Sequence, residues 1–140
     1  MDFTTAQIRD ALAAAISNGV AGAWQVSAYM LALPQPPAID LRPSGIRFDA
    51  SMDRGNDDLS YTIRAFTAYN SDQGAQIKLD TLLDRNPSST TGLKAILETD
   101  KTLGGVVADL RIMTASDYKP LTIEGQPPLL AVEFTVLVYP

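Results

Sequence analysis

The sequence predicts an α+β domain in which helices pack on one face of a mostly antiparallel sheet that includes a long β-hairpin. Segments with a helical hydrophobic period stand at the start and in the middle of the chain, and segments of alternating apolar residues lie between and after them. The strand-like segments follow one another without regular βα repeats, which favours antiparallel pairing. With 140 residues the chain is expected to form one domain, residues 1–140, whose core needs no disulfide or metal.

The N-terminal segment is predicted to be a helix that begins at a capping box. Thr4-Thr5-Ala6-Gln7 places a threonine three residues before a glutamine, and their side chains can satisfy free backbone donors of the first turn. The apolar stripe of this helix consists of Ile8, Ala11, Leu12, Ala15 and Ile16. Asn18-Gly19 predicts a left-handed stop.

Prolines limit the next part of the chain. Residues 24–33 are interpreted as an extended segment, which Pro34, Pro36 and Pro37 prevent from continuing as a regular strand or helix. A short edge strand, Ile39-Asp40-Leu41-Arg42, is expected before Pro43.

A long β-hairpin is predicted between Ile46 and Tyr69. One arm covers residues 46–52, the tip is Asp53-Arg54-Gly55-Asn56, and the return arm begins at Asp58. In the return arm Leu59, Tyr61 and Ile63 alternate with polar residues, which is typical of a half-buried strand.

Two short amphipathic helices, a glycine turn and two strands are predicted for the second half. Asn70-Ser71-Asp72 is expected to cap the first of these helices. The apolar stripes are Ala75, Leu79, Leu82 and Leu83 in the first helix, and Leu93, Ile96 and Leu97 in the second. Leu103-Gly104-Gly105 predicts a turn before a strand-like run of Val106, Val107, Leu110 and Ile112. The last strand, 129–139, places Leu130, Val132, Phe134, Val136 and Val138 on one face.

The composition excludes several kinds of chemistry. The chain has no cysteine and no histidine, which removes thiolate nucleophiles, zinc-thiolate sites and the commonest acid/base group. A net charge of −5 disfavours binding to a phosphate backbone, which requires clustered Lys and Arg. No run approaches the ~18 apolar residues of a membrane span, and the N-terminus lacks a secretion signal. An intracellular, soluble product without a membrane partner is therefore expected.

The acidic hairpin segment is the most tempting candidate site. It contains Asp49, Asp53, Arg54, Asp57 and Asp58, and clustered oxygens can bind hard cations. Its spacing does not fit the EF-hand loop, and Arg54 lies among the would-be ligands. We therefore interpret it as a solvated hairpin tip, and as a candidate partner-facing element.

Carboxylate pairs offer a second candidate chemistry. Asp57 with Asp58, or Glu98 with Asp100, could in principle act as acid and base. Adjacent strand residues point to opposite faces, and Asp100 fits a turn at a helix end. Phosphate-binding and nucleophile motifs are absent from the sequence. The expectation is thus no catalytic residue, no cofactor and no metal.

Apolar residues on polar faces indicate a surface for a partner. Ile77 lies opposite the apolar stripe of its helix, and Phe66 shares a strand face with Thr62 and Arg64. The edge residues Ile39 and Leu41 would add unpaired backbone groups to this surface. The candidate inter-subunit surface is therefore Ile39, Leu41, Arg64, Phe66 and Ile77.

The order of these segments resembles that of tail terminator, or tail completion, proteins of long-tailed bacteriophages, of the lambda type. The segments that carry the resemblance are the proline-rich 34–38, the hairpin tip 53–57, Leu79-Asp80-Thr81-Leu82-Leu83-Asp84, Gly92-Leu93-Lys94-Ala95-Ile96-Leu97, the turn region 100–107 and the terminal apolar strand. The linker 120–128, with Pro127-Pro128 before the last strand, departs from the family pattern.

The resemblance implies a structural protein without enzymatic activity. Subunits would form a homo-hexameric ring on the finished tail tube, stop polymerisation of the tube protein and present a docking face to the head–tail connector or stopper protein. The protein would assemble in the host cytoplasm and reside at the head-proximal end of the tail, with DNA passing through the lumen without specific binding. An acidic ring suits such a conduit, because like charge repels the phosphate backbone.

Three alternatives stay open from the sequence. A neck or head-completion protein of the same virus type would have similar size and acidity. A tail-tube subunit would itself polymerise. A small metal-dependent hydrolase would need convergent carboxylates in a pocket.

Overall fold

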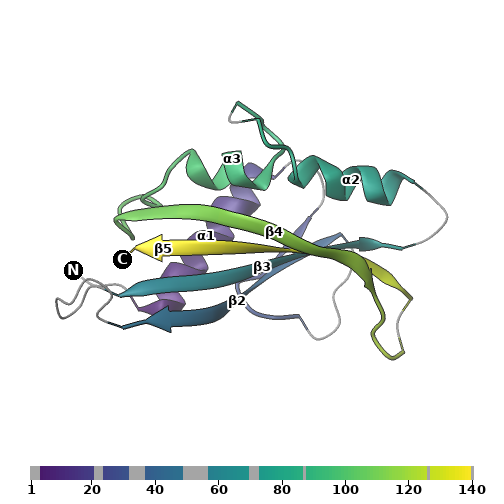
Figure 1. Cartoon of the computed structure of the whole chain (residues 1–140), viewed down its shortest axis with the longest axis horizontal. Coiled ribbons are helices and arrows are strands. Elements are labelled where there is room, and N and C mark those ends of the chain that lie inside the picture. The colour runs from purple at the N-terminus through teal and green to yellow at the C-terminus, as the bar shows by residue number, and fades with distance from the viewer. Residues whose placement is uncertain are drawn as a thin grey trace.

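The fold is described from a computed structural model, which describes residues 4–20, 24–31, 37–48, 57–69, 73–86, 88–125 and 127–139. These residues form the predicted α+β architecture, with three helices and a five-stranded sheet (Figure 1). In chain order the elements are α1 (Thr5–Gly19), β1 (Gln25–Val26), β2 (Ala38–Arg47), β3 (Asp58–Ala68), α2 (Gly74–Leu82), α3 (Leu93–Glu98), β4 (Asp109–Leu121) and β5 (Leu129–Tyr139).

The sheet is mostly antiparallel, as predicted, with the strand order β1-β2-β3-β5-β4. The pair β1–β2 is parallel, and β2–β3, β3–β5 and β5–β4 are antiparallel. The central position belongs to β3, which pairs with β2 along one edge and with β5 along the other. Because β3 exposes neither edge, its backbone groups are satisfied within the domain.

Two predicted strand boundaries are wrong. The short strand at 39–42 and the described part of the hairpin arm at 46–52 are one strand, β2, which passes through Pro43 with a register shift between Pro43 and Gly45. A bulge lets the strand accommodate proline, which has no N–H to donate to a ladder. The extended segment predicted for 24–33 contains only two strand residues, Gln25 and Val26. The hairpin tip, 53–56, and Pro34 and Pro36 lie outside the described residues.

The capping box at the start of α1 is confirmed. The Thr4 hydroxyl accepts from the Gln7 N–H, and the Gln7 side chain accepts from the Thr4 N–H at 2.7 Å. The predicted left-handed stop is wrong, because Gly19 is still helical and Val20 continues in an extended conformation. Gly19 has a different role: a Cβ at this position would collide with the side chain of Ile96 in α3. Glycine here permits close packing of two helices.

The two later helices and the glycine turn are confirmed, although the strand after them starts later than predicted. The helix α2 begins at Gly74, and the predicted cap at 70–72 lies outside the described residues. Leu103, Gly104 and Gly105 have φ angles of 51°, 71° and 96°. Val106 and Val107 belong to this turn, and β4 starts only at Asp109.

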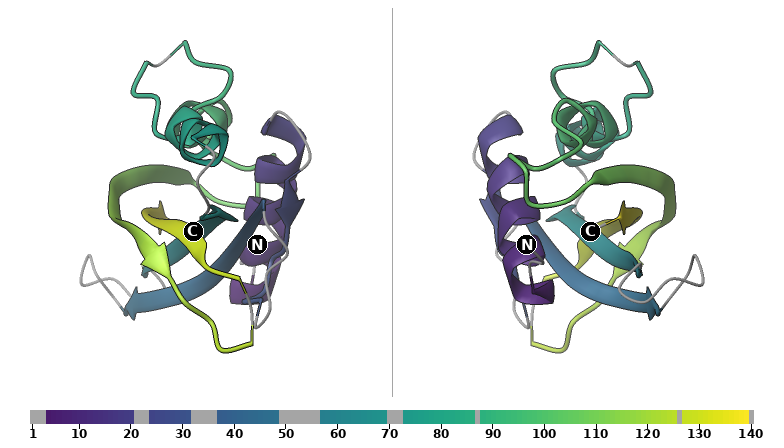
Figure 2. Two further views of the ribbon diagram at one scale, coloured as in Figure 1. Left: turned by 90° about the vertical axis from the view of Figure 1, so that its right-hand side faces the viewer. Right: turned by 90° about the vertical axis from the view of Figure 1, so that its left-hand side faces the viewer.

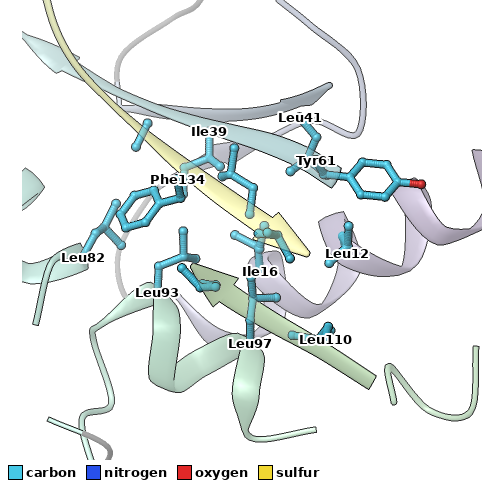
Figure 3. Close-up of a cluster of buried hydrophobic side chains, with 14 of the residues drawn as sticks. Leu12, Ile16, Ile39, Leu41, Tyr61, Leu82, Leu93, Leu97, Leu110 and Phe134 are labelled. Atoms are coloured by element: carbon cyan, nitrogen blue, oxygen red, sulfur yellow. The ribbon is translucent and has the colours of Figure 1, made fainter. Parts of the chain in front are cut away.

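All three helices contribute to one hydrophobic cluster (Figure 3). Its helical members include Leu12 and Ile16 from α1, Leu82 from α2, and Leu93 and Leu97 from α3. These side chains meet residues of the sheet that share one face by register, among them Leu41, Ile63 and Phe134. In Figure 1, α1 passes behind the strands, whereas α2 and α3 lie beside β4; Figure 2 shows the curved sheet from its two ends.

A second, smaller cluster lies on the opposite face of the sheet. It consists of Ala38, Phe66, Leu129 and Ala131, and Leu31, Leu121 and Ile123 pack against it. The strand β3 is therefore buried on both faces, with Ile63 on one side and Phe66 on the other. Within the described residues, no helix has the length and apolar character needed to span a membrane.

One polar group in the core supports a prediction about stability. The Thr67 hydroxyl is buried and makes no hydrogen bond to any residue that the structure describes. A buried unpaired hydroxyl destabilises the folded state. Replacing Thr67 with the isosteric valine should raise the free energy of unfolding by about 1 kcal/mol, as measured by urea denaturation.

The matched control is Thr67→Ser, which keeps the hydroxyl and removes a buried methyl group. This variant should be less stable than the wild type, by about 1 kcal/mol. A Thr67→Val protein that is less stable than the wild type would show that the hydroxyl has a partner.

Candidate functional site

The predicted edge at Ile39 to Arg42 is already occupied within the chain. Ile39 pairs with Val26 of β1, and its carbonyl accepts from the Ser27 N–H at 2.9 Å. The Leu41 carbonyl accepts from Arg9 Nη2 at 3.0 Å. The side chains of Ile39 and Leu41 are fully buried in the main cluster. The prediction that these residues belong to an inter-subunit surface is therefore wrong, because β1 and Arg9 cover this part of the edge.

Arg9 closes the edge by joining three parts of the chain. From α1 it donates through Nε to the Ala28 carbonyl and through Nη2 to the Leu41 carbonyl. Its guanidinium lies 4.4 Å from the centre of the Tyr29 ring. Guanidinium has several fixed donors and stays charged, so one side chain can satisfy two carbonyls and stack on an aromatic ring.

Arg64 and Phe66 also lie inside the domain. Asp40, which is fully buried, accepts from Arg64 Nε at 2.9 Å and from Arg64 Nη2 at 2.5 Å, and its Oδ2 accepts from the Leu31 N–H at 2.9 Å. The Arg64 guanidinium lies 4.9 Å from the centre of the Phe66 ring, and Phe66 is buried in the second cluster. Assigning Phe66 to an inter-subunit surface is wrong, because Leu31, Leu121 and Ile123 pack against its cluster on this face of the sheet. Arg64 keeps 18% of its side chain accessible, and its guanidinium is bonded to Asp40 within the chain.

The outer edge of β4 is blocked by side chains of α3. Glu98 Oε2 accepts from the Ile112 N–H at 3.3 Å, and Lys94 Nζ donates to the Ile112 carbonyl at 3.4 Å. Lys94 and Glu98 also form an ion pair with each other. The register of β4 shifts between Ile112 and Thr114 and again between Ser116 and Lys119. Side-chain bonds to edge backbone groups, and bulges of this kind, hinder strand addition by another chain at these positions.

Ile77 is exposed, as predicted, with 61% of its surface accessible. It stands on α2, which a further contact ties to β4: the Tyr118 hydroxyl donates to Asp80 at 2.9 Å. Burial, together with this hydrogen bond, raises the pKa of Tyr118 to about 12. The hydroxyl thus keeps its proton at neutral pH and holds β4 against α2.

Sequence reasoning missed other exposed apolar residues, among them Phe48, Met113 and Ile46. Phe48 follows the last residue of β2 and is 72% exposed, and Met113 is 51% exposed where the register of β4 shifts. Ile46, two residues before Phe48, is also exposed. The signal available in the sequence was Met113 itself, an apolar residue that interrupts the alternation of its strand after Ile112.

A groove of about 440 Å³ lies beside Met113, between the end of α2 and β4. Its apolar lining consists of Leu82, Leu83, Ile112, Met113, Ala115 and Phe134. The polar residues Asp84, Arg85, Lys94 and Thr114 complete its wall. A hydrogen bond from the Asn86 N–H lowers the pKa of Asp84, so that this carboxylate stays charged at neutral pH. A larger groove of about 700 Å³ runs between α1 and α3 and is lined in part by alanines.

The acidic hairpin is described only at its edges. Asp49, Asp53 and Arg54 lie outside the described residues. Asp57 immediately precedes β3, and Asp58 begins it, in register with Arg47 of β2. Among the residues that the structure describes, no group of three or more acidic side chains is placed to hold a metal ion.

Both members of the other carboxylate pair, Glu98 and Asp100, accept hydrogen bonds from backbone N–H groups. Glu98 accepts from the Ile112 N–H, and Asp100 accepts from the N–H groups of Thr102 and Gly104 at 3.1 and 2.9 Å. A hydrogen bond from the Thr102 hydroxyl, together with these two backbone bonds, lowers the pKa of Asp100. The interpretation of Asp100 as a turn residue is confirmed.

The buried Asp40–Arg64 pair gives a second prediction. Asp40→Ala should lower the free energy of unfolding by about 3–5 kcal/mol, because it leaves the partly buried guanidinium without a partner. The double variant Asp40→Leu/Arg64→Met removes both charges and should be more stable than Asp40→Ala, as measured by urea denaturation. Equal losses in the two proteins would show that the cost arises elsewhere, for example in the lost bond to Leu31.

Comparison with known proteins does not assign the chain to a family. No protein-family model matches it, and no curated protein is significantly similar to it in sequence.

Proposed function

We propose that this chain is a structural virion protein that caps the completed tail tube of a long-tailed bacteriophage. Subunits form a six-membered ring on the tube, stop its polymerisation and offer a docking face to the head connector. The proposal starts from the resemblance of the segment order to lambda-type tail terminators. The α+β plan, with a mostly antiparallel sheet and helices at the predicted central segments, is compatible with it.

The observation that carries the proposal is a pair of unlike apolar surfaces at the two sides of the sheet. Ile46 and Phe48 are exposed at the end of β2, and Met113 with its groove lies beside β4. Unlike surfaces on one subunit favour head-to-tail contacts, which close into rings when the rotation between subunits permits. A ring-shaped cap requires contacts of this type.

The alternatives are separated by simple observations. A neck or head-completion protein would be found on heads and not on purified headless tails. A tube subunit would form filaments by itself, which electron microscopy would detect. A metal-dependent hydrolase would bind divalent cations, and calorimetry would record the heat. The described carboxylates Asp40, Glu98 and Asp100 are already bonded within the chain, which makes the hydrolase the weakest of the three.

Native mass spectrometry of the free protein and of the protein on tails tests the proposal. We expect a cyclic hexamer in at least one of these states, and a monomer is acceptable as the resting form if closure occurs only on the tube. Tails assembled without the protein should exceed normal length in electron micrographs. The absence of a cyclic species from both samples would overturn the proposed function.

The acidic hairpin supports a separate prediction about DNA passage. If it lines the lumen, the variant Asp53→Lys/Asp57→Lys/Asp58→Lys should slow DNA ejection at low salt, because lysine pairs with phosphates, and high salt should relieve the delay. Folding should change little, since exposed charges contribute little to stability. Normal ejection at both salt concentrations would place the hairpin away from the lumen. An intact ring that fails to join heads would make it a docking element.

A further inference from the structure

The end of β2 carries an apolar projection. Phe48 is the most exposed large apolar residue of the described chain, and Ile46 stands two residues before it. Ile46 is in register with Leu59, which is in register with Val138, and both of these belong to the main cluster. The projection therefore continues the core surface outward. An exposed aromatic side chain of this kind can supply a large part of the binding energy of an interface.

The groove beside β4 provides a matching cavity. Pockets of about 300–1,000 Å³ accommodate small ligands, so a groove of about 440 Å³ has room for an aromatic ring and a neighbouring side chain. Its walls are mostly apolar, and Met113 at its side is a flexible residue that adapts to an inserted ring. A phenyl group would lose part of its contact with water there.

The projection and the groove of one subunit cannot meet. Ala115 in the groove wall pairs with Phe134 of β5, Phe134 pairs with Ile63 of β3, and Ile63 pairs with Leu41 of β2. Leu41 belongs to β2, on the side of the sheet away from β4, and Phe48 lies seven residues further along the chain. Strand geometry then separates the two positions by roughly 20 Å. Only the groove of another subunit can receive Phe48.

Charges near the two surfaces are complementary. Arg47 precedes Phe48, and Asp58 lies opposite Arg47 in register, while the groove carries Asp84, Arg85 and Lys94, of which Lys94 is paired with Glu98. Arg47 and Arg85 make no ion pair with any side chain in the described part of the chain. An approach that inserts Phe48 can bring Arg47 toward Asp84 and Asp58 toward Arg85, which would fix the orientation of the contact.

We infer that Ile46 and Phe48 of one copy of this chain insert into the groove between α2 and β4 of the next copy, and that this contact closes the ring. The inference rests on the proposed function, which requires a head-to-tail assembly. The contact uses side chains and leaves the blocked backbone edges as they are, which distinguishes it from addition of a strand to the sheet.

Engineered cysteines test this contact directly, because the natural chain has none. The variant Phe48→Cys/Ala115→Cys should, under mild oxidation, give a ladder of disulfide-linked oligomers on non-reducing gels that ends in a covalently closed ring. A bond within one subunit is not possible, since a disulfide joins Cα atoms only about 4–7 Å apart. The matched control, Tyr69→Cys/Ala115→Cys, replaces another exposed aromatic residue and should give no ladder.

A variant without cysteine measures the strength of the contact. Phe48→Ala should weaken subunit association by about 30-fold or more, as expected for an aromatic anchor, whereas Tyr69→Ala should leave association unchanged. Sedimentation velocity over a concentration series measures both effects, and circular dichroism verifies that each variant is folded.

The outcomes separate this inference from the proposed function. A wild-type ring together with no ladder from Phe48→Cys/Ala115→Cys would overturn the contact and leave the cap function standing. Dimers from Phe48→Cys alone would indicate a symmetric contact between two projections and would also overturn it. Absence of any ring, free or on tails, would refute the function itself.

Discussion

The fold depends on burying β3 on both faces and pairing it along both edges. Its inner face, represented by Ile63, meets the helices, while Phe66 on its other face is covered by the segments around Leu31 and Ile123. Covering this second face requires the chain to carry a charge into the interior, because Asp40 must receive the Leu31 N–H and the Arg64 guanidinium. A buried carboxylate is tolerated only with such partners. This polar anchor holds the backbone at Leu31 against the sheet.

Polar side chains also satisfy backbone groups at the edges of the sheet. Arg9 bonds the Leu41 carbonyl on one side, and Lys94 with Glu98 bonds both backbone groups of Ile112 on the other. Unpaired edges invite uncontrolled association through the backbone, and these side chains prevent it at the positions where they bond. At Leu41 and Ile112, therefore, a contact with another chain has to use side-chain surfaces.

The carboxylates of Glu98 and Asp100 accept hydrogen bonds from backbone N–H groups. Asp100 holds the turn at Leu103 to Gly105, where positive φ angles disfavour a regular strand, and Glu98 fixes the start of β4. These roles account for Glu98 and Asp100, one of the two carboxylate pairs that the sequence offered as catalytic candidates. Because of this turn, β4 begins only at Asp109. This start sets the register of β4 against β5, and the register places Met113 beside the groove.

The sequence by itself determined the class of the fold, the capped start of α1, the helices α2 and α3 and the central and terminal strands, because capping and hydrophobic period are local properties. It also indicated the exposure of Ile77. It could not place Ile39 and Leu41, which look like surface residues on a short edge strand, or Phe66, which shares a strand face with the polar residues Thr62 and Arg64. Their burial was decided by Arg9 and by segments distant in the sequence that fold over the sheet. The groove at Met113 likewise joins residues from four separate elements, α2, α3, β4 and β5, so only tertiary packing brings them together.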